Sequence, residues 1–167
     1  MRHLVLSDIH GNWPALEAVL QAAPPFDRVL FLGDAVGYYP DGDRVLGWLR
    51  EVGAECVLGN HDAWLLALDR LPVEGVVLEI LEWQRGRLSP ENLAFLASWP
   101  WQREAEGALL VHGSPCDPWE YLDDLAPARQ AFRPNLDLPI LARFEARILA
   151  RFNNGVFWVP VDELMPT

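Results

Sequence analysis

The sequence predicts an α/β domain in which a central, largely parallel β-sheet is covered by helices. Short apolar runs alternate along the first half of the chain with segments whose apolar residues recur every three or four positions. Repeated strand–helix units of this kind favour a parallel sheet with helices outside it. At 167 residues, of which 51% are apolar, the chain is long enough to bury a core, and no repeat or linker divides residues 1–167 into smaller domains.

Three strands and two helices are predicted in the first third of the chain. The strands are the apolar runs HLVLS (3–7), RVLFLG (28–33) and ECVLG (55–59). The first helix should begin near Trp13, because Asn12 is a suitable N-cap and Pro14 is tolerated in the first turn. The second helix should follow Pro40, where apolar residues again recur at helical spacing.

The middle of the chain reads as helices followed by one more strand. The segments with helical character are HDAWLLALDRL (61–71), VVLEILEWQ (76–84) and NLAFLASW (92–99). The sequence Ser89-Pro90-Glu91 is a helix start, with serine as the cap and proline in the first turn. The run ALLVHG (108–113) is the fourth predicted strand.

Charge and composition exclude several classes of protein. The net charge is −11 and all 13 basic residues are arginines, so binding to a phosphate backbone is disfavoured. No apolar run is long enough to span a membrane, and the acid at Asp8 comes too early for a secretory signal. The two cysteines, Cys56 and Cys116, form no disulfide framework, and we therefore expect a cytoplasmic protein.

Polar side chains follow all four predicted strands at the point where each strand ends. They are Asp8 and His10, Asp34, Asn60 with His61 and Asp62, and finally His112. Each alone has an ordinary explanation as a turn, a helix cap or a core histidine. Because functional groups collect beyond the carboxyl ends of strands in α/β sheets, adjacent strands would bring them together. Carboxylate, amide and imidazole ligands in one place suit Mn²⁺, Fe or Zn²⁺ rather than a cysteine cage.

The motifs DIH, GD, GNHD and HG, in this order, resemble those of the calcineurin-like metallophosphoesterases. The segments SDIHGNWPALEAVL, LGDAVGYYPD, VLGNHDAWLL and LVHGSPCDPWEYL are similar to the bacterial branch of small phosphodiesterases in that family, and the resemblance covers residues 1–122. It implies an αββα sandwich formed by two sheets. It also implies hydrolysis of phosphate monoesters or, preferentially, diesters by metal-activated water, with a small phosphate ester as the substrate.

The resemblance further implies a role for each of the polar residues. Asp8 and His10 would bind a first metal ion, Asp34 would bridge two ions, and Asn60 and His112 would bind the second. His61 would donate a hydrogen bond or a proton to the phosphate. Asp62 would orient His61, or would instead be an acid favoured by the dipole of the following helix. The two divalent ions are expected to be Mn²⁺, with Fe, Zn or Ni as alternatives.

The C-terminal tail, residues 127–167, departs from the family pattern. The resemblance implies a late G-H-T-H motif, but the four histidines are His3, His10, His61 and His112, and none follows residue 112. The expected sandwich is therefore incomplete at its C-terminal end. The spacing of apolar residues predicts an amphipathic helix over residues 139–152, serving as a packing element or as a contact in a homo-oligomer.

Three explanations of this departure stay open. The tail could result from a shifted reading frame, or water could fill the remaining metal positions, with Cys116 as a further candidate zinc ligand. Alternatively, the protein keeps the fold and serves as a binding or regulatory module with weak or no activity. The aromatic run Tyr38-Tyr39-Pro40 could contact a base or ester group, or could simply stabilise a turn.

Overall fold

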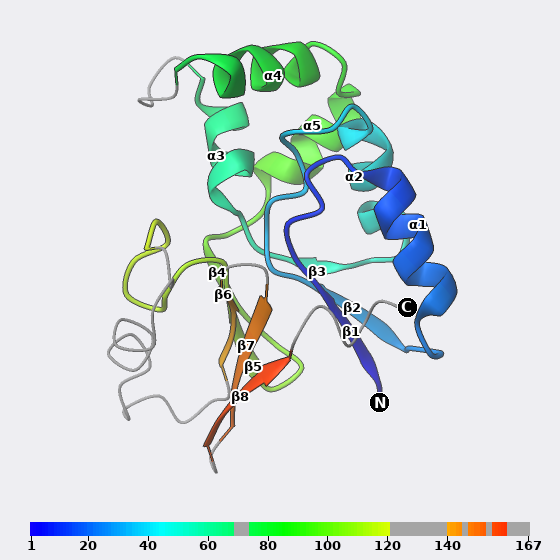
Figure 1. Ribbon diagram of the computed structural model, residues 1–167, viewed down its shortest axis with the longest axis vertical. Coiled ribbons are helices and arrows are strands. Elements are labelled where there is room, and N and C mark those ends of the chain that lie inside the picture. Colours follow the sequence, from blue (N-terminus) through cyan, green and yellow to red (C-terminus); the bar gives the residue numbers. More distant parts are fainter. Residues whose placement is uncertain (69–73, 121–139, 145–146, 153–154, 160–167) are drawn as a thin grey trace.

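The computed structural model describes residues 1–68, 74–120, 140–144, 147–152 and 155–159 (Figure 1). The described residues form two β-sheets, with helices covering the sheet that contains the N-terminal strands (Figure 1). The alternation of strands and helices predicted one sheet, whereas the two sheets agree with the fold that the family resemblance implied.

The first sheet is parallel and has the strand order β1-β2-β3. Its strands are β1 (His3–Leu6), β2 (Arg28–Phe31) and β3 (Glu55–Cys56), and Val5 pairs with Leu30 in the register of β1 and β2. The helices α1 (Trp13–Ala22) and α2 (Gly42–Glu51) follow β1 and β2. All three carboxyl ends of these strands therefore lie at one edge of the sheet.

The helix starts agree with the predictions made from capping residues. The Asn12 side chain accepts a hydrogen bond from the main-chain N–H of Ala15 at 3.1 Å at the start of α1, as an N-cap should. Ser89 caps α5 (Pro90–Ala97) in the same way. Between them lie α3 (Asn60–Leu66) and α4 (Val76–Arg85).

The second sheet is mixed and has the order β4-β5-β6-β7-β8. Its strands are β4 (Gln102–Ala105), β5 (Ala108–Val111), β6 (Ile140–Phe144), β7 (Arg147–Phe152) and β8 (Gly155–Val159). All neighbouring strands are antiparallel except β5 and β6, which are parallel. The strand β4 was not predicted, because its sequence QREA lacks an apolar run.

The helix predicted over residues 139–152 is wrong, because this segment forms the strands β6 and β7. The main chain of β6 pairs with the free edge of β5, where Leu109 lies opposite Ile140. Pairing with an existing strand overrides local helical periodicity, since isoleucine, leucine and phenylalanine also suit strands. The element through which we expected a homo-oligomer to form is therefore part of a sheet.

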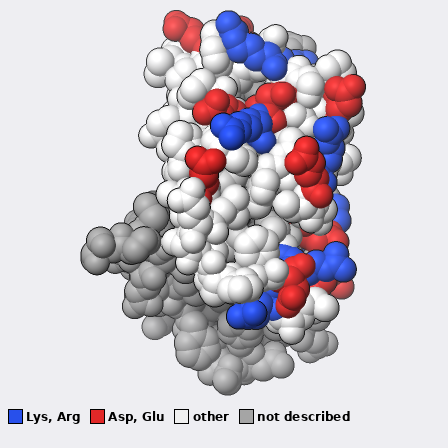
Figure 2. All heavy atoms as spheres, turned by 90° about the vertical axis from the view of Figure 1, so that its right-hand side faces the viewer, with Lys and Arg blue, Asp and Glu red and all other residues white. Residues whose placement is uncertain are grey.

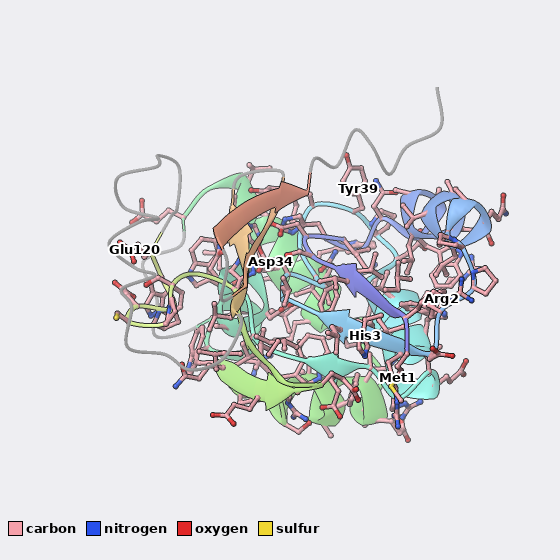
Figure 3. The ribbon with its side chains drawn as sticks, turned by 90° about the horizontal axis from the view of Figure 1, so that it is seen from below. Met1, Arg2, His3, Asp34, Tyr39 and Glu120 are labelled. Carbon is pink, nitrogen blue, oxygen red and sulfur yellow. The ribbon has the colours of Figure 1, made fainter. Side chains whose placement is uncertain are left out.

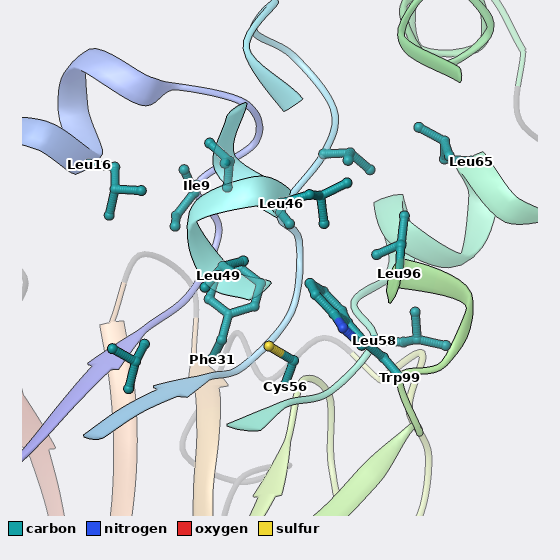
Figure 4. Close-up of a cluster of buried hydrophobic side chains, with 14 of the residues drawn as sticks. Ile9, Leu16, Phe31, Leu46, Leu49, Cys56, Leu58, Leu65, Leu96 and Trp99 are labelled. Atoms are coloured by element: carbon teal, nitrogen blue, oxygen red, sulfur yellow. The ribbon is translucent and has the colours of Figure 1, made fainter. Parts of the chain in front are cut away.

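The hydrophobic core consists of two layers that meet at β2. Phe31 and Val29 belong to the cluster between the first sheet and the helices, together with Leu46 and Leu49 of α2 (Figure 4). Leu30, which alternates with these residues in β2, belongs to a second cluster. The members of this cluster are Leu30, Leu32, Val57, Ala108 and Leu110. Because successive side chains point to opposite faces of a strand, β2 packs on the helices with one face and on the second sheet with the other.

The helical face of the molecule carries charges of both signs. Figure 2 shows arginine side chains next to aspartate and glutamate side chains over the described atoms of this face. The excess of acidic residues is thus not gathered into a single patch there. Among the described residues, no helix combines the length and the apolar character needed to cross a membrane.

Candidate metal centre

The loops that follow β1 and β2 continue the pairing of their strands. The main-chain N–H groups of Asp8 and His10 donate to the carbonyl oxygens of Gly33 (3.0 Å) and Asp34 (2.9 Å). The N–H of Gly11 donates to the carbonyl of Ala35 at 2.7 Å. Residues that are 24 or 25 positions apart in the sequence are therefore held side by side by the main chain.

Three of the predicted ligands have an unusual backbone conformation. Asp8, His10 and Asp34 adopt φ angles of 55°, 52° and 62°, in the left-handed region that residues other than glycine seldom occupy. Among the described non-glycine residues, the one other case is Glu106, in the turn between β4 and β5. Such conformations cluster at functional sites, where the surrounding structure enforces them.

The Asp34 carboxylate lies at the centre of the site and is almost fully buried. Its Oδ1 accepts the main-chain N–H of His61 at 2.9 Å. Its Oδ2 lies 3.7 Å from Nε2 of His10 and 3.5 Å from Nε2 of His112. One carboxylate oxygen thus faces two imidazoles, of which one follows a strand of the first sheet and the other follows a strand of the second.

The orientation of both imidazoles is fixed by carbonyl oxygens. Nδ1 of His10 lies 3.0 Å from the carbonyl oxygen of Val36, and Nδ1 of His112 lies 2.6 Å from that of Leu32. Because a carbonyl only accepts hydrogen bonds, Nδ1 carries the proton in the neutral form of each ring. The Nε2 lone pairs are then directed at Asp34, which is how histidines are usually prepared to bind metals.

The remaining predicted ligands, Asp8 and Asn60, complete two sets of donor atoms around Asp34. Oδ1 of Asp8 lies 3.7 Å from Nε2 of His10, and Oδ1 of Asn60 lies 3.1 Å from Nε2 of His112. One ligand atom from each of Asp8, Asp34 and His112 fits within a span of 4.8 Å. The structure therefore brings all five predicted ligands together, and their oxygen and imidazole donors fit divalent transition-metal ions.

The electrostatics of the site favour a negative carboxylate among the histidines. Burial opposes ionisation of Asp34, but the charge and hydrogen bond of His112 and the charge of His10 outweigh it and lower the pKa of Asp34 to about 2. Burial also opposes protonation of His10, yet its contacts with Asp8 and Asp34 raise the pKa of that ring. The carboxylates therefore create a potential that attracts positive charge to this place.

His61 lies beside the donor atoms and is held by ring contacts. Its ring centroid is 4.6 Å from that of His10, 4.8 Å from Tyr38 and 4.9 Å from Trp64. Its buried Nδ1 has no hydrogen-bond partner among the described residues. Burial lowers the pKa of His61 to about 4. Its Nδ1 is therefore a polar atom next to the centre that makes no hydrogen bond with the described residues.

Asp62 makes its hydrogen bonds with the main chain and not with the His61 ring. Its carboxylate accepts four N–H groups, those of Asp34 (2.7 Å), Ala35 (2.9 Å), Val36 (3.2 Å) and Gly59 (3.0 Å). Burial and the charge of Asp34 raise the pKa of Asp62, and the N–H donors limit that rise. Asp62 thus joins the first turn of α3 to the loop that carries Asp34.

Gln84 is a residue of the site that the sequence analysis missed. Its buried side chain accepts the N–H of Gly37 at 2.8 Å and donates to the carbonyl oxygens of Gly37 and Tyr39. It thereby fixes the loop that follows Asp34 to α4. One signal was present in the sequence, because Gln84 is an uncharged polar residue three positions after Leu81 on the apolar side of α4.

Gly37 provides the space for two of the histidine rings. With φ at +127°, a Cβ atom at this position would lie 2.7 Å from Nδ1 of His10 and 2.9 Å from Nδ1 of His61. Both distances are shorter than real Cβ atoms show. A larger residue would therefore displace the rings or the loop.

Comparisons with known proteins agree with this geometry. The family model described as calcineurin-like phosphoesterase matches residues 1–153. An uncharacterised protein of Methanocaldococcus jannaschii is 33% identical over 129 residues, which are 71% of this chain and 52% of that protein. A symmetrical bis(5'-nucleosyl)-tetraphosphatase of Methylococcus capsulatus is 31% identical over 68% of this chain and 43% of its own length. The chain thus spans about half the length of these relatives.

A solved structure is similar over nearly the whole chain. A metallophosphoesterase from Sphaerobacter thermophilus superposes with a TM-score of 0.78 and is 30% identical. The superposition covers 96% of this chain and 69% of that protein.

We predict that Asp62→Ala lowers the free energy of unfolding by about 3 kcal/mol or more, because four buried N–H groups lose their acceptor. Urea denaturation followed by circular dichroism measures this change. Glu82→Ala, which removes an exposed acid from α4, should change the free energy by less than about 0.5 kcal/mol. Equal stability of the two variants would contradict the structural role of Asp62.

We predict that Gly37→Ala weakens Mn²⁺ binding by at least about tenfold, because the added methyl group displaces imidazoles that must hold their orientation. The matched control is Gly53→Ala, since Gly53 also has a positive φ, of +64°, but an added Cβ there meets nothing within 4 Å. Titration of each variant, followed by the electron paramagnetic resonance signal of free Mn²⁺, measures the affinity. Similar losses in both variants would attribute the effect to backbone strain instead.

Proposed function

The chain belongs to the calcineurin-like phosphoesterase family, and from this premise we propose that it hydrolyses phosphodiesters with the help of two divalent metal ions, Mn²⁺ above all. The observation that carries the proposal is the position of Asp34. Its Oδ2 faces His10 and His112 at once, at 3.7 and 3.5 Å, so one carboxylate belongs to both sets of donors. Two ions that share a carboxylate are a common arrangement for in-line attack on phosphorus.

We divide the residues between the two ions as the family resemblance implies. Asp8, His10 and Asp34 would hold one ion, and Asp34, Asn60 and His112 would hold the other. When bound, such ions supply positive charge that draws in the phosphate and make a water molecule more acidic. The carbonyl oxygens of Val36 and Leu32 keep the two imidazoles in the orientation that this role requires.

His61 is proposed to act on the phosphate rather than on a metal ion. Its ring packs edge-on against His10, and we place the phosphate beside both rings. From there it would donate a hydrogen bond or a proton to a phosphoryl oxygen or to the leaving group. Asp62 would support this role indirectly, because it fixes the first turn of α3 in which His61 lies.

The proposed substrates are small phosphate esters. A net charge of −11 disfavours a polymeric phosphate backbone, whose binding depends on many basic contacts. Several relatives are named symmetrical bis(5'-nucleosyl)-tetraphosphatases, and we therefore include small nucleotide esters among the substrates proposed for this chain.

A second candidate function is that of a metal-binding regulatory module with weak activity. One observation favours it, since residues 113–167 contain no histidine and the residues proposed above supply three side chains to each ion. The measurement of turnover described next distinguishes the two candidates.

We predict that the protein hydrolyses bis(p-nitrophenyl) phosphate in the presence of Mn²⁺, that EDTA abolishes the reaction and that Mg²⁺ replaces Mn²⁺ poorly, because imidazole ligands favour later metals. Release of p-nitrophenol measures turnover. Asp34→Asn should reduce kcat by at least about 100-fold at saturating Mn²⁺, since it weakens both proposed ion sites. Turnover no faster than that of Mn²⁺ alone would refute the enzyme and leave the regulatory module.

We predict that His61→Ala lowers kcat by about 100-fold or more and leaves the Mn²⁺ content unchanged, because general acid–base groups contribute about 10²–10⁴-fold. The matched control is His3→Ala, which removes a surface histidine paired with Glu106 and should leave kcat unchanged. Elemental analysis and steady-state kinetics on the same samples provide both readouts. Loss of metal from the His61 variant would make His61 a ligand.

A further inference from the structure

An open cavity lies between the loop that follows Asp34 and helix α4. Its volume is about 330 Å³, and its walls are formed by Tyr38, Tyr39, Pro40, Glu79, Ile80, Trp83 and Gln84. This volume falls at the lower end of the range of about 300–1,000 Å³ that is typical of small-molecule sites. None of these seven lining residues is a proposed metal ligand.

The cavity lies next to the metal centre, and Tyr38 contacts both. This residue lines the cavity, and its ring centroid lies 4.8 Å from the rings of both His10 and His61. The main-chain N–H of the next residue, Tyr39, donates to the carbonyl of His10 at 2.9 Å. Figure 3 shows Asp34 among the buried side chains and Tyr39 nearer to the edge of the molecule. A molecule whose phosphate reached Asp34 would thus place its organic part against the tyrosines.

The walls of the cavity are held in place before any ligand binds. Gln84 uses both ends of its amide to fix the main chain of Gly37 and Tyr39. The guanidinium of Arg87 lies 3.9 Å from the centroid of the Trp83 ring and covers one face of it. A preformed aromatic wall favours binding because few side chains need to be ordered.

The chemistry of the lining selects one class of ligand. Two tyrosines and a tryptophan, which are 53%, 50% and 43% exposed, offer ring surface on which a flat group can stack. Glu79 is the one charged residue of the lining, and its carboxylate can accept hydrogen bonds from N–H donors. The Gln84 amide is already engaged and offers little for recognition.

We propose that this cavity, called here the aromatic cavity, binds a planar heteroaromatic ring with N–H donors, which is the chemistry of a nucleobase. The inference rests on the proposed function, because it places the phosphate of the same molecule at the metal centre. The ring stacks on the exposed aromatic side chains, and its N–H groups face Glu79. The substrate class is therefore nucleotide esters rather than alkyl or sugar phosphates.

The test uses the full chain in EDTA and titrates it with adenosine, which has a base but no phosphate. Isothermal titration calorimetry should detect binding of adenosine and none of ribose. Trp83→Ala should weaken adenosine binding about tenfold, since stacking of a base on an aromatic residue contributes about 1–3 kcal/mol. The matched control is Trp119→Ala, because Trp119 is similarly exposed, at 40%, and does not line the cavity. Tyr39→Ala gives an independent second variant, for which we expect a weakening of several fold.

The outcomes separate this inference from the proposed function. Adenosine binding that depends on Trp83, without any hydrolysis, would support the aromatic cavity and refute the phosphodiesterase. Hydrolysis of bis(p-nitrophenyl) phosphate without adenosine binding would support the phosphodiesterase and refute the aromatic cavity. Equal affinity of wild type and Trp83→Ala would overturn the inference. Self-association that Trp83→Ala abolishes, in a protein that does not bind adenosine, would also overturn it and make the surface an interface between copies of the chain.

Discussion

The whole site depends on one buried carboxylate that binds main chain rather than ligand. Asp62 accepts N–H groups from the loop after β2 and from the loop after β3. These bonds fix the main chain from Asp34 to Val36, and they join it to the first turn of the helix that carries His61. A buried carboxylate with four donors is strongly constrained, because moving any one of the partners leaves polar groups unpaired in the core. The positions of the predicted site residues thus depend on a carboxylate whose hydrogen bonds go to the main chain.

The orientations of His10 and His112 depend on the positions of the two sheets. The carbonyl of Leu32, just beyond β2, orients His112, which comes from the second sheet. This contact requires the two sheets to pack closely, and the cluster that contains Leu30 and Leu110 brings them together. His10 is oriented in a similar way by the carbonyl of Val36. Packing of the apolar core therefore determines the distance between the two proposed ion sites, and the metal centre is a consequence of the fold rather than an addition to it.

The sequence was sufficient to predict features that depend on neighbouring residues. It failed to predict features that depend on contacts between residues far apart in the chain. The proximity of residues such as Asp8 and Asp34 was predicted because each directly follows an apolar strand, and the carboxyl ends of parallel strands lie at one edge of a sheet. The tail strands β6 and β7 were predicted as a helix, because β6 joins the sheet by pairing with β5, which lies far away in the sequence, and β7 in turn pairs with β6. The role of Gln84 was missed for a similar reason, since its partners lie 45 and 47 residues away. The contact of a side chain with a distant main chain leaves almost no trace in periodicity.

The left-handed backbone at Asp8, His10 and Asp34 has a consequence for how this protein can evolve. A non-glycine residue in such a conformation costs about 1–3 kcal/mol, and whole domains are stable by only about 5–15 kcal/mol. Glycine would relieve this cost at each position, so selection for stability alone would replace the acids and the imidazole. Their presence agrees with a proposed function that retains these side chains at the expense of stability. Stabilising the protein by design should therefore avoid these three positions, because glycine there would stabilise the fold but remove a proposed metal ligand.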